Sequence, residues 1–283
     1  MFLKLVDISI VSDYYYFCKP VPEIGSQTNY SGGNNMNQPI VVNTLEFQKE
    51  LQSGVAQASL FERIANLGAT GVEVRREYIN DFDQELANIK ANSQKLNLTV
   101  FYSVPDEVFV NGKLNDQLPK YLAEGTKMGI TAIKFNTGDY ANFHGDLKAT
   151  LDPIVSTGIQ VNVENDQTQV SGTIAPLQNF LQAVKDSQID LGYVYDLGNW
   201  RYVGENEITA AQKLGEFTRY IHLKDVQVTD GKPAVTPLDD GELDWHKVLN
   251  ILPKDLPIAI EYPSDSDAIV KAGIEKVEAA LAD

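Results

Sequence analysis

Short runs of β-branched and aromatic residues alternate along the chain with longer segments in which apolar residues recur at helical spacing. The strand-like runs cover residues 5–12, 71–77, 98–105, 131–138, 159–165, 191–200, 220–228 and 257–264. The helical segments cover residues 59–68, 81–97, 118–129, 146–158, 174–188, 207–218, 244–252 and 267–281. Eight strands in alternation with helices predict parallel strands joined by crossover helices. Over 283 residues, this pattern indicates a single α/β domain, 1–283, folded as a (β/α)8 TIM barrel.

One stretch interrupts the alternation. Residues 13–57 contain SDYYYFCKP and SQTNYSGGNNMNQP, which are rich in Asn, Gly, Ser and Tyr. A connection of this length between two elements is unusual in a compact domain. We therefore expect a long insertion after a first strand at 5–12, on the face of the barrel where active sites are built. The pattern leaves open whether it is a lid over substrate or an excursion without function.

Composition narrows the class of protein. A formal net charge of −16 argues against binding of nucleic acid, whose phosphates need clustered Lys and Arg. The single cysteine, Cys18, excludes a disulfide framework within the chain and a cysteine-based zinc cluster. The start, MFLKLVDISIVSD, lacks the features of a signal peptide, and no apolar run is long enough to span a membrane. We therefore expect a soluble, cytoplasmic protein with no membrane partner.

Polar residues stand at or near the carboxyl ends of four consecutive strand-like runs. These residues are Glu164 in VNVEND, Asp196 in YVYDLGNW, His222 in YIHLKD and Glu261 in IAIEYP. In a parallel barrel, the carboxyl ends of the strands converge on one face, so these side chains should meet. Three carboxylates and one imidazole suit a hard or borderline divalent ion. The pattern predicts a site for Mn²⁺, Mg²⁺ or Co²⁺ rather than Zn²⁺.

Five further residues are candidates for contact with a substrate. Asn199 follows Asp196 by three residues, and its alternative role is to cap the turn around Gly198. The other four are charged residues on strand-like runs, namely Lys224, Lys134, Glu73 and Arg75. For these four, a structural ion pair is at least as good an explanation as substrate contact, and Glu73 and Arg75 share a strand face on which they could pair.

The motifs VENDQ, YDLGNW, HLKD, DGELDW and IEYP resemble those of the xylose isomerase-like TIM-barrel family of sugar isomerases and epimerases. The resemblance covers the chain apart from 13–57. Its details are most similar to the epimerase-like proteins of 2-ketogluconate utilisation operons.

The resemblance implies roles for the four strand-end residues. It makes Glu164, Asp196, His222 and Glu261 the metal ligands, and it makes Glu164 and Glu261 the acid/base pair. One position departs from the family pattern, because many such epimerases have His where this chain has Asn199. A substrate-contacting Glu of the family also has no clear counterpart in NDQTQVSG. The identity of the substrate therefore does not transfer.

The resulting hypothesis is a divalent-metal-dependent isomerase or epimerase. It would act on a keto-sugar, sugar phosphate or keto-sugar acid by proton transfer through a metal-stabilised enediolate. The alternatives are a metal-dependent dehydratase of a hydroxy-keto acid and a non-catalytic sugar-binding barrel. The DNA-repair endonuclease branch of the superfamily is disfavoured, because it uses many histidines and this chain has three. The sequence leaves the sugar, the metal and any homo-oligomer undetermined.

Overall fold

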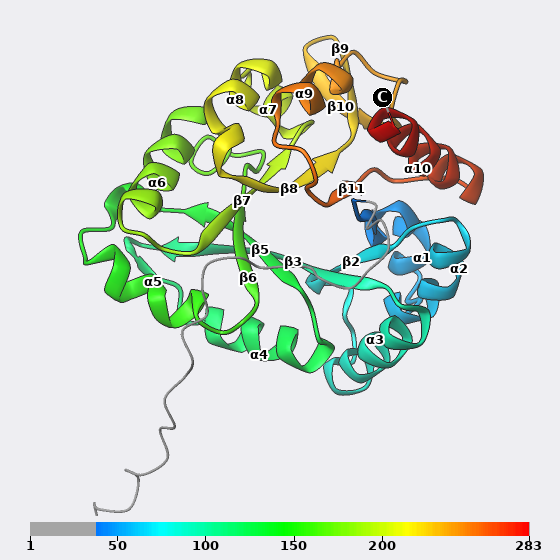
Figure 1. Cartoon of the computed structure of the whole chain (residues 1–283), viewed down its shortest axis with the longest axis horizontal. Coiled ribbons are helices and arrows are strands. Elements are labelled where there is room, and N and C mark those ends of the chain that lie inside the picture. The colour runs from blue at the N-terminus through cyan, green and yellow to red at the C-terminus, as the bar shows by residue number, and fades with distance from the viewer. Residues whose placement is uncertain (1–37, 283) are drawn as a thin grey trace, which may run out of the picture. The chain divides into compact units, whose positions relative to one another are not determined.

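The computed structural model describes residues 38–282, in which eight parallel strands form a closed barrel (Figure 1). The barrel strands are β1 (Ile40–Asn43), β2 (Gly71–Arg75), β3 (Thr99–Val110), β5 (Ala132–Gly138), β6 (Gln160–Glu164), β7 (Leu191–Asp196), β8 (Thr218–Leu223) and β11 (Ile258–Ile260). Each is hydrogen-bonded to its neighbours in chain order, and β1 closes the ring by pairing with both β2 and β11. The predicted (β/α)8 TIM barrel is confirmed.

The position of the first barrel strand corrects the sequence analysis. Ile40–Asn43 is itself a barrel strand, followed by the 3-10 helix η1 (Thr44–Phe47) and by α1 (Gln48–Gln52). Residues 40–52 are therefore part of the barrel and not of an insertion at 13–57. The strand was missed because IVVN has only four residues and directly follows a polar, glycine-rich stretch. The strand expected at 5–12 and the stretch 13–37 lie outside the described residues, and the domain limits 1–283 stay a prediction.

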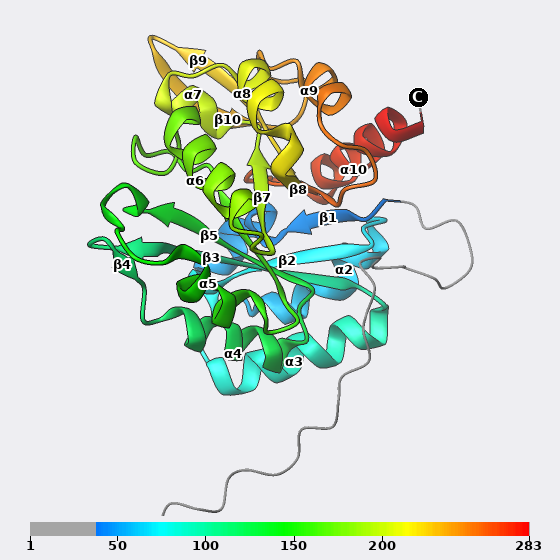
Figure 2. The ribbon, with the colours of Figure 1, turned by 60° about the vertical axis from the view of Figure 1, so that its left-hand side comes forward.

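Helices surround the strands, with α3 and α4 below the barrel and α8 and α9 above it in the view of Figure 2. They are α2 (Phe61–Asn66), α3 (Phe82–Leu96), α4 (Leu118–Met128), α5 (Leu147–Val155), α6 (Ile174–Asp186), α7 (Asn199–Val203), α8 (Glu207–Leu214), α9 (Trp245–Ile251) and α10 (Asp267–Ala282). Short 3-10 helices are η2 (Gln57–Leu60), η3 (Arg76–Tyr78), η4 (Tyr140–Asn142) and η5 (Gly215–Phe217). Every predicted helix overlaps an observed one. No helix of the described part is long and apolar enough to cross a membrane.

Three features at the carboxyl ends of the strands were not predicted. The run 191–200 ends as a strand at Asp196, and α7 begins at Asn199. The run 220–228 divides into β8 and β9 (Asp225–Thr229), which forms an antiparallel hairpin with β10 (Lys232–Thr236). Strand β3 continues to Val110 and turns back into β4 (Lys113–Leu114). All three lie at the barrel face where functional residues were expected.

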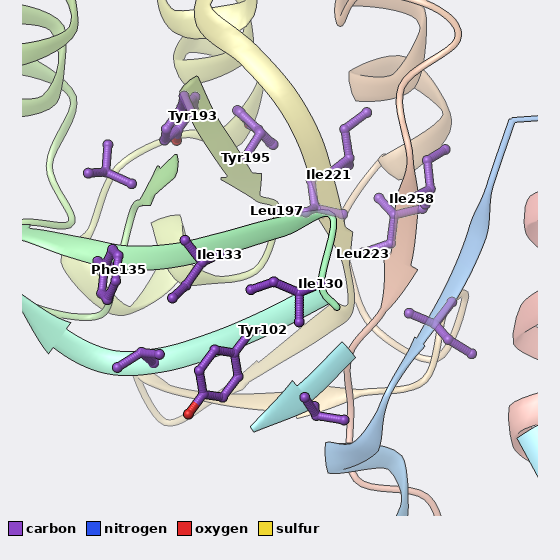
Figure 3. Packing of buried hydrophobic residues seen from close by; sticks show 14 of the residues in the cluster. Tyr102, Ile130, Ile133, Phe135, Tyr193, Tyr195, Leu197, Ile221, Leu223 and Ile258 are labelled. Atoms are coloured by element: carbon purple, nitrogen blue, oxygen red, sulfur yellow. The ribbon is translucent and has the colours of Figure 1, made fainter. Parts of the chain in front are cut away.

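Side chains alternate along each strand between the barrel interior and the helices, as the pleat requires. Outward residues such as Ile133, Phe135, Tyr195 and Ile221 pack into the main apolar core (Figure 3). Inward residues form a separate small apolar cluster, here called the inner apolar layer. It consists of Val41, Phe101, Ala132, Val194, Tyr220 and Ala259.

Two residues further along each of those strands, the interior becomes polar. The residues at these positions, here called the polar layer, are Asn43, Ser103, Lys134, Asp196, His222 and Glu261, and all are buried. Because the side-chain period of a strand is two, each polar residue stands above its apolar neighbour on the same face. Each of these strands thus carries an inward apolar residue and, two residues closer to its carboxyl end, an inward polar residue.

Candidate metal centre

Three of the four predicted ligands, Asp196, His222 and Glu261, belong to the polar layer, and the fourth, Glu164, lies beside them. Glu164 ends β6, Asp196 ends β7, His222 is the fifth residue of β8, and Glu261 directly follows β11. Strand register brings Asp196 opposite His222, whose other neighbour is Ala259, two residues before Glu261. All four side chains are buried, and one potential ligand atom from each lies within 4.8 Å of the others. The structure therefore brings together residues separated by as many as 97 positions in the chain, since 261 − 164 = 97.

In the two carboxylates on β6 and β7, the protein holds one oxygen by hydrogen bonds or an ion pair, and the other oxygen accepts no hydrogen bond from the described residues. Glu164 Oε2 contacts the ammonium of Lys134, whereas Glu164 Oε1 has no hydrogen-bond partner among the described residues. Asp196 Oδ1 accepts hydrogen bonds of 3.0 Å from the backbone N–H groups of Gly198 and Asn199. Asp196 Oδ2 accepts no hydrogen bond in the described part of the chain, although Lys224 Nζ lies 2.6 Å from it. In each carboxylate, the contacts of one oxygen fix the orientation of the group, and the other oxygen remains available as a metal ligand.

His222 is likewise held through one of its two polar atoms, in this case by Glu73 on β2. The ring nitrogen Nε2 lies 2.8 Å from Glu73 Oε2, and a hydrogen bond there requires the proton on Nε2. The other nitrogen, Nδ1, lies 2.8 Å from Glu164 Oε1 and 3.2 Å from Glu261 Oε2. Within residues 38–282, neither contact of Nδ1 has hydrogen-bond geometry. A carboxylate behind a histidine is the arrangement that fixes the tautomer of metal-ligating imidazoles.

The charges in the pocket shift several pKa values. Burial opposes ionisation of Glu164, but Lys134 and His222 outweigh it and lower the pKa of Glu164 to about 2. Burial raises the pKa of Asp196 to about 7 despite the opposing effect of Lys224. Burial would lower the pKa of His222, yet Glu73, Glu261 and Glu164 raise it well above its usual value. The pocket therefore favours a positive charge at the point where Nδ1 faces Glu164 and Glu261.

These observations fit a divalent ion. Three buried atoms of ligand type, Glu164 Oε1, Asp196 Oδ2 and His222 Nδ1, have no hydrogen-bond partner among the described residues, and the side chains that carry them lie close together. Buried polar atoms of this kind are costly unless a partner satisfies them. A cation coordinated by carboxylate and imidazole would satisfy all three at once. The donor set does not identify the metal.

Three cations and Glu261 complete the pocket. Lys224 Nζ lies 2.6 Å from Asp196 Oδ2 and 2.9 Å from Glu261 Oε2, and Arg75 Nη1 lies 2.7 Å from Glu261 Oε1. Lys134 contacts Glu164 from β5. Burial alone would raise the pKa of Glu261, but Lys224, His222 and Arg75 hold it well below its usual range. The predicted substrate-binding residues Lys224, Lys134 and Arg75 thus all face the candidate metal ligands.

The other two predicted substrate-binding residues have partners within the protein. Glu73 contacts His222 and not Arg75, so the pairing expected between Glu73 and Arg75 does not form. Asn199 donates through Nδ2 to the backbone oxygen of Asn165 at 2.8 Å, and its Oδ1 accepts from Gln167 at 3.0 Å. Asn199 therefore joins the loop after β6 to the start of α7. Substrate contact by either residue stays a prediction.

Sequence analysis missed Asn43 and left the role of Asn165 unassigned. Asn43 ends β1, is fully buried, and donates through Nδ2 to Glu73 Oε1 at 2.8 Å and to Glu261 Oε1 at 2.9 Å. Asn165 Oδ1 accepts from the backbone N–H of Asp196 at 2.9 Å, so it holds β6 against β7. The signal for Asn43 was the run IVVN, a strand-like sequence that ends in an amide, as the runs at Glu164 and Asp196 end in acids.

Glu46 is a fifth buried carboxylate, and it contacts the loop that follows the candidate ligand Glu261. It accepts from the backbone N–H of Tyr262 at 3.0 Å and contacts the hydroxyl of Ser264, so it holds the loop that follows Glu261. Burial is the largest influence on Glu46 and raises its pKa to about 8, although both hydrogen bonds act in the opposite direction. Glu46 also lines a pocket of about 210 Å³ with Arg63 and Ser266. Unlike Glu164 and Glu261, it has no cationic partner in the described part of the chain.

Comparison with known families agrees with the barrel fold. The family defined as xylose isomerase-like TIM barrel matches residues 61–280, which is most of the chain. The protein therefore belongs to the xylose isomerase-like TIM barrel family, as its motifs predicted. The narrower resemblance to proteins of 2-ketogluconate utilisation operons stays a prediction. No curated protein sequence matches significantly.

Solved structures share the fold at low sequence identity. A probable 3-DHS dehydratase, AsbF, from Bacillus anthracis superimposes with a TM-score of 0.65 at 12% identity, over 85% of this chain and 98% of that one. D-allulose 3-epimerase from Methylomonas sp. in complex with D-allulose gives 0.64 at 15% identity, over 86% and 96%. The IolI protein with a bound zinc atom gives 0.62 at 13% identity, over 86% and 98%. At these identities, the structural similarity shows that the fold is shared and does not identify the reaction, which has to be inferred from the residues of the site.

Proposed function

We propose that the protein is a divalent-metal-dependent sugar isomerase or epimerase that moves a proton at a carbon next to a carbonyl group. One observation carries the proposal. Glu164, Asp196 and His222 are each held by the protein through one polar atom, and each has a second buried polar atom that makes no hydrogen bond to the described residues. Such a preorganised set of charged ligands is what metal-assisted proton transfer needs.

The chain supplies its own base. The low pKa of Glu164, about 2, keeps this carboxylate ionised at neutral pH, so it is ready to accept a proton from a carbon–hydrogen bond. Glu261 is ionised for the same reason and enters the pocket from β11, which is not adjacent to β6 in the barrel. A substrate between Glu164 and Glu261 would lose its proton to one of them, and the carbon would regain a proton either from that same carboxylate or from the other one after it had taken up a proton from solvent. Return to the same carbon is epimerisation, and return to the neighbouring carbon is isomerisation.

Removal of a proton from carbon leaves negative charge on the substrate oxygens. When bound, a divalent ion supplies Lewis-acid stabilisation of that charge. Lys224 is the residue of this chain placed to assist, because its ammonium already lies within 2.9 Å of both Asp196 and Glu261. Burial of the pocket excludes water, which strengthens these charge interactions.

The family supports an enzyme of this kind, and the named neighbours illustrate the range of reactions on this fold. One neighbour is a D-allulose 3-epimerase and another is a probable dehydratase. A dehydratase would start with the same proton abstraction and then expel a hydroxyl group. A non-catalytic sugar-binding barrel would not need ionised carboxylates on two sides of the pocket.

Solvent hydrogen exchange tests the proposal most directly. Protein purified without chelator and supplied with Mn²⁺ is incubated in deuterated water with a panel of ketoses and keto-sugar acids. We expect deuterium at a carbon next to the carbonyl of at least one compound, lost after chelator treatment and restored by Mn²⁺. Analysis of the product then separates epimerisation, isomerisation and dehydration. Absence of exchange with every compound, in protein that binds the metal, would reject the proposal.

A further inference from the structure

Asn43 lies between two buried carboxylates of the barrel interior, Glu73 and Glu261. Its strand, β1, is paired with β2 on one side and with β11 on the other. Asn43 is opposite Glu73 in the register with β2. In the register with β11, Val42 is opposite Ile260, the residue before Glu261. The closure of the barrel by β1 therefore places one amide side chain beside both carboxylates.

The direction of the Asn43 amide is fixed by its oxygen. Asn43 Oδ1 accepts a hydrogen bond of 2.9 Å from the backbone N–H of Leu45, at the start of η1. A backbone N–H only donates, so the oxygen and the nitrogen of the amide cannot be exchanged. Nδ2 then donates to Glu73 Oε1 at 2.8 Å and to Glu261 Oε1 at 2.9 Å. Both hydrogens of Nδ2 are thus used on carboxylates.

Capping of η1 does not by itself explain why residue 43 is Asn. Ser, Thr and Asp cap helices about as well, because each supplies an oxygen acceptor. Among these four residue types, Asn alone carries an NH₂ group with two donor hydrogens. Asp would place a third carboxylate against Glu73 and Glu261, and Ser or Thr has a single O–H donor. The second and third hydrogen bonds of Asn43 therefore serve the two carboxylates and not the cap.

One of these hydrogen bonds acts on His222 through Glu73. Glu73 Oε1 accepts from Asn43, and Glu73 Oε2 lies 2.8 Å from His222 Nε2. The carboxylate of Glu73 is thus held at both oxygens, which fixes the position from which it contacts the imidazole ring. With Nε2 held in this way, Nδ1 lies 2.8 Å from Glu164 Oε1 and 3.2 Å from Glu261 Oε2.

The other hydrogen bond acts on Glu261 directly. Glu261 Oε1 accepts from Asn43 and from Arg75 Nη1, the latter at 2.7 Å. Glu261 Oε2 lies 3.2 Å from His222 Nδ1 and 2.9 Å from Lys224 Nζ. Asn43 and Arg75 therefore hold the oxygen Oε1, and Oε2 is the oxygen that faces the candidate ligand His222.

We infer, on the basis of the proposed function, that Asn43 is a positioning residue for two candidate metal ligands at once, namely His222 through Glu73 and Glu261 directly. Both donors belong to one planar amide, so their positions cannot change independently. Loss of the amide should weaken metal binding although every ligand is still present, because partners behind metal ligands orient them.

Substitution of Asn43 by other capping residues tests the inference. Asn43→Ser keeps an oxygen for the Leu45 N–H and removes both Nδ2 donors, and Asn43→Thr does the same with an added methyl group that fills part of the space. Affinity for Mn²⁺ alone is measured by competition with a chelating dye, and urea unfolding shows that each variant is folded. We expect an affinity about 10–100-fold weaker than that of wild type. Wild-type affinity in either folded variant would overturn the inference.

Asn206 provides a matched control. It is the exposed N-cap of α8, where its Oδ1 accepts from the backbone N–H of Thr209 at 2.9 Å. Its side-chain hydrogen bonds to the described residues involve Thr209 and Glu207 and no candidate ligand. Asn206→Ser and Asn206→Thr should therefore leave Mn²⁺ affinity unchanged. An equal loss of affinity in the variants of Asn43 and Asn206 would mean that an altered cap is sufficient, and would overturn the inference.

A double variant tests the path through Glu73, which a purely structural role for Asn43 would not use. Mn²⁺ affinity is measured for Asn43→Ser, for Glu73→Gln and for the two combined. Residues in one hydrogen-bond network act non-additively. We therefore expect the loss in the double variant to be at least about threefold smaller than the product of the two single losses. Losses that multiply fully would show that Asn43 does not act on His222 through Glu73.

The inference and the proposed function fail in different ways. Weaker Mn²⁺ binding in Asn43→Ser, when the wild-type protein exchanges no deuterium with any compound, would support the positioning role and reject the isomerase function. Deuterium exchange by the wild-type protein, together with unchanged Mn²⁺ affinity in Asn43→Ser, would support the function and reject the positioning role.

Discussion

The inner apolar layer and the polar layer lie on the same strands and are both buried inside the barrel, yet apolar contacts hold the first together and ion pairs hold the second. Phe101 and Tyr220 stack at a centroid distance of 4.5 Å in the apolar layer. Two residues beyond Tyr220, His222 lies among carboxylates, and its Nδ1 makes no hydrogen bond to any residue that the structure describes. The apolar layer gains free energy from burial. Burial of the polar layer costs free energy, and ion pairs offset part of that cost. We propose that a bound metal and a bound substrate offset more of it.

At the candidate metal centre, neighbouring cations influence the pKa of a carboxylate more than burial does. Glu164 and Glu261 are as buried as Glu46, but their pKa values are lowered, while that of Glu46 is raised to about 8. The difference is the presence of Lys134, Lys224, His222 and Arg75 beside the first two carboxylates. Position in the fold, and not residue type, decides which carboxylate is charged.

The largest expected effect lies in the polar layer. Glu261→Gln removes a proton-transfer group and a metal ligand while keeping the shape of the side chain. We expect turnover to fall by about 10²–10⁴-fold, with stability largely retained. Activity on the substrate identified by deuterium exchange and metal content are measured in parallel. Glu62→Gln, on the exposed face of α2, is the control and should behave as wild type. Full activity in Glu261→Gln would remove this residue from the mechanism.

The next effect should appear in the inner apolar layer as lost stability. Phe101→Ala deletes a ring that is 4% exposed and stacked on Tyr220. We expect the free energy of unfolding to fall by about 3–5 kcal/mol, and by less in Phe101→Leu. Urea unfolding measures the change. If Phe101→Ala lowered activity in the folded protein as much as Glu261→Gln does, the functional separation of the two layers would be wrong.

A smaller effect is expected for the residue that positions His222. Glu73→Gln keeps a hydrogen-bond acceptor near Nε2 but removes the negative charge that orients and polarises the imidazole. We expect metal affinity to fall by about 10–100-fold, measured by competition with a chelating dye. Glu77→Gln, which changes a partly exposed carboxylate near Arg75, serves as the comparison. Unchanged metal affinity in Glu73→Gln would show that Glu73 does not act through His222.

The effect at Glu46 differs from the other three because it depends on pH. The folded protein keeps the proton on Glu46 up to about pH 8, whereas an ordinary glutamate releases it near pH 4.5. The folded state therefore binds more protons in this window, so stability should fall as pH rises from about 4.5 to 8. The slope is at most about 1.4 kcal/mol per pH unit.

Glu46→Gln cannot ionise, so its stability relative to wild type should increase with pH across this window. Urea unfolding of both proteins at pH 5, 6, 7 and 8 measures the difference. A constant difference at all four pH values would show that Glu46 is ionised in the folded protein.

Sequence periodicity predicted seven of the eight barrel strands and the helices between them, because alternation at periods of two and 3.6 residues is a local property. It failed where local signals are weak or where one run contains two elements. IVVN was too short to stand out beside a polar stretch, and β8 continues almost directly into the β9–β10 hairpin. The four candidate ligands were found because each ends an apolar run with a polar residue.

The sequence by itself determined the barrel, the family and the four side chains of the candidate metal centre. Only the tertiary structure decided how their partners are arranged. Glu73, which could have paired with Arg75 two residues away, contacts His222, 149 positions along the chain. Asn43 donates to Glu73, 30 positions along the chain, and to Glu261, 218 positions along it. Such contacts depend on which strands are neighbours and how the barrel closes, and no local pattern of residues contains that information.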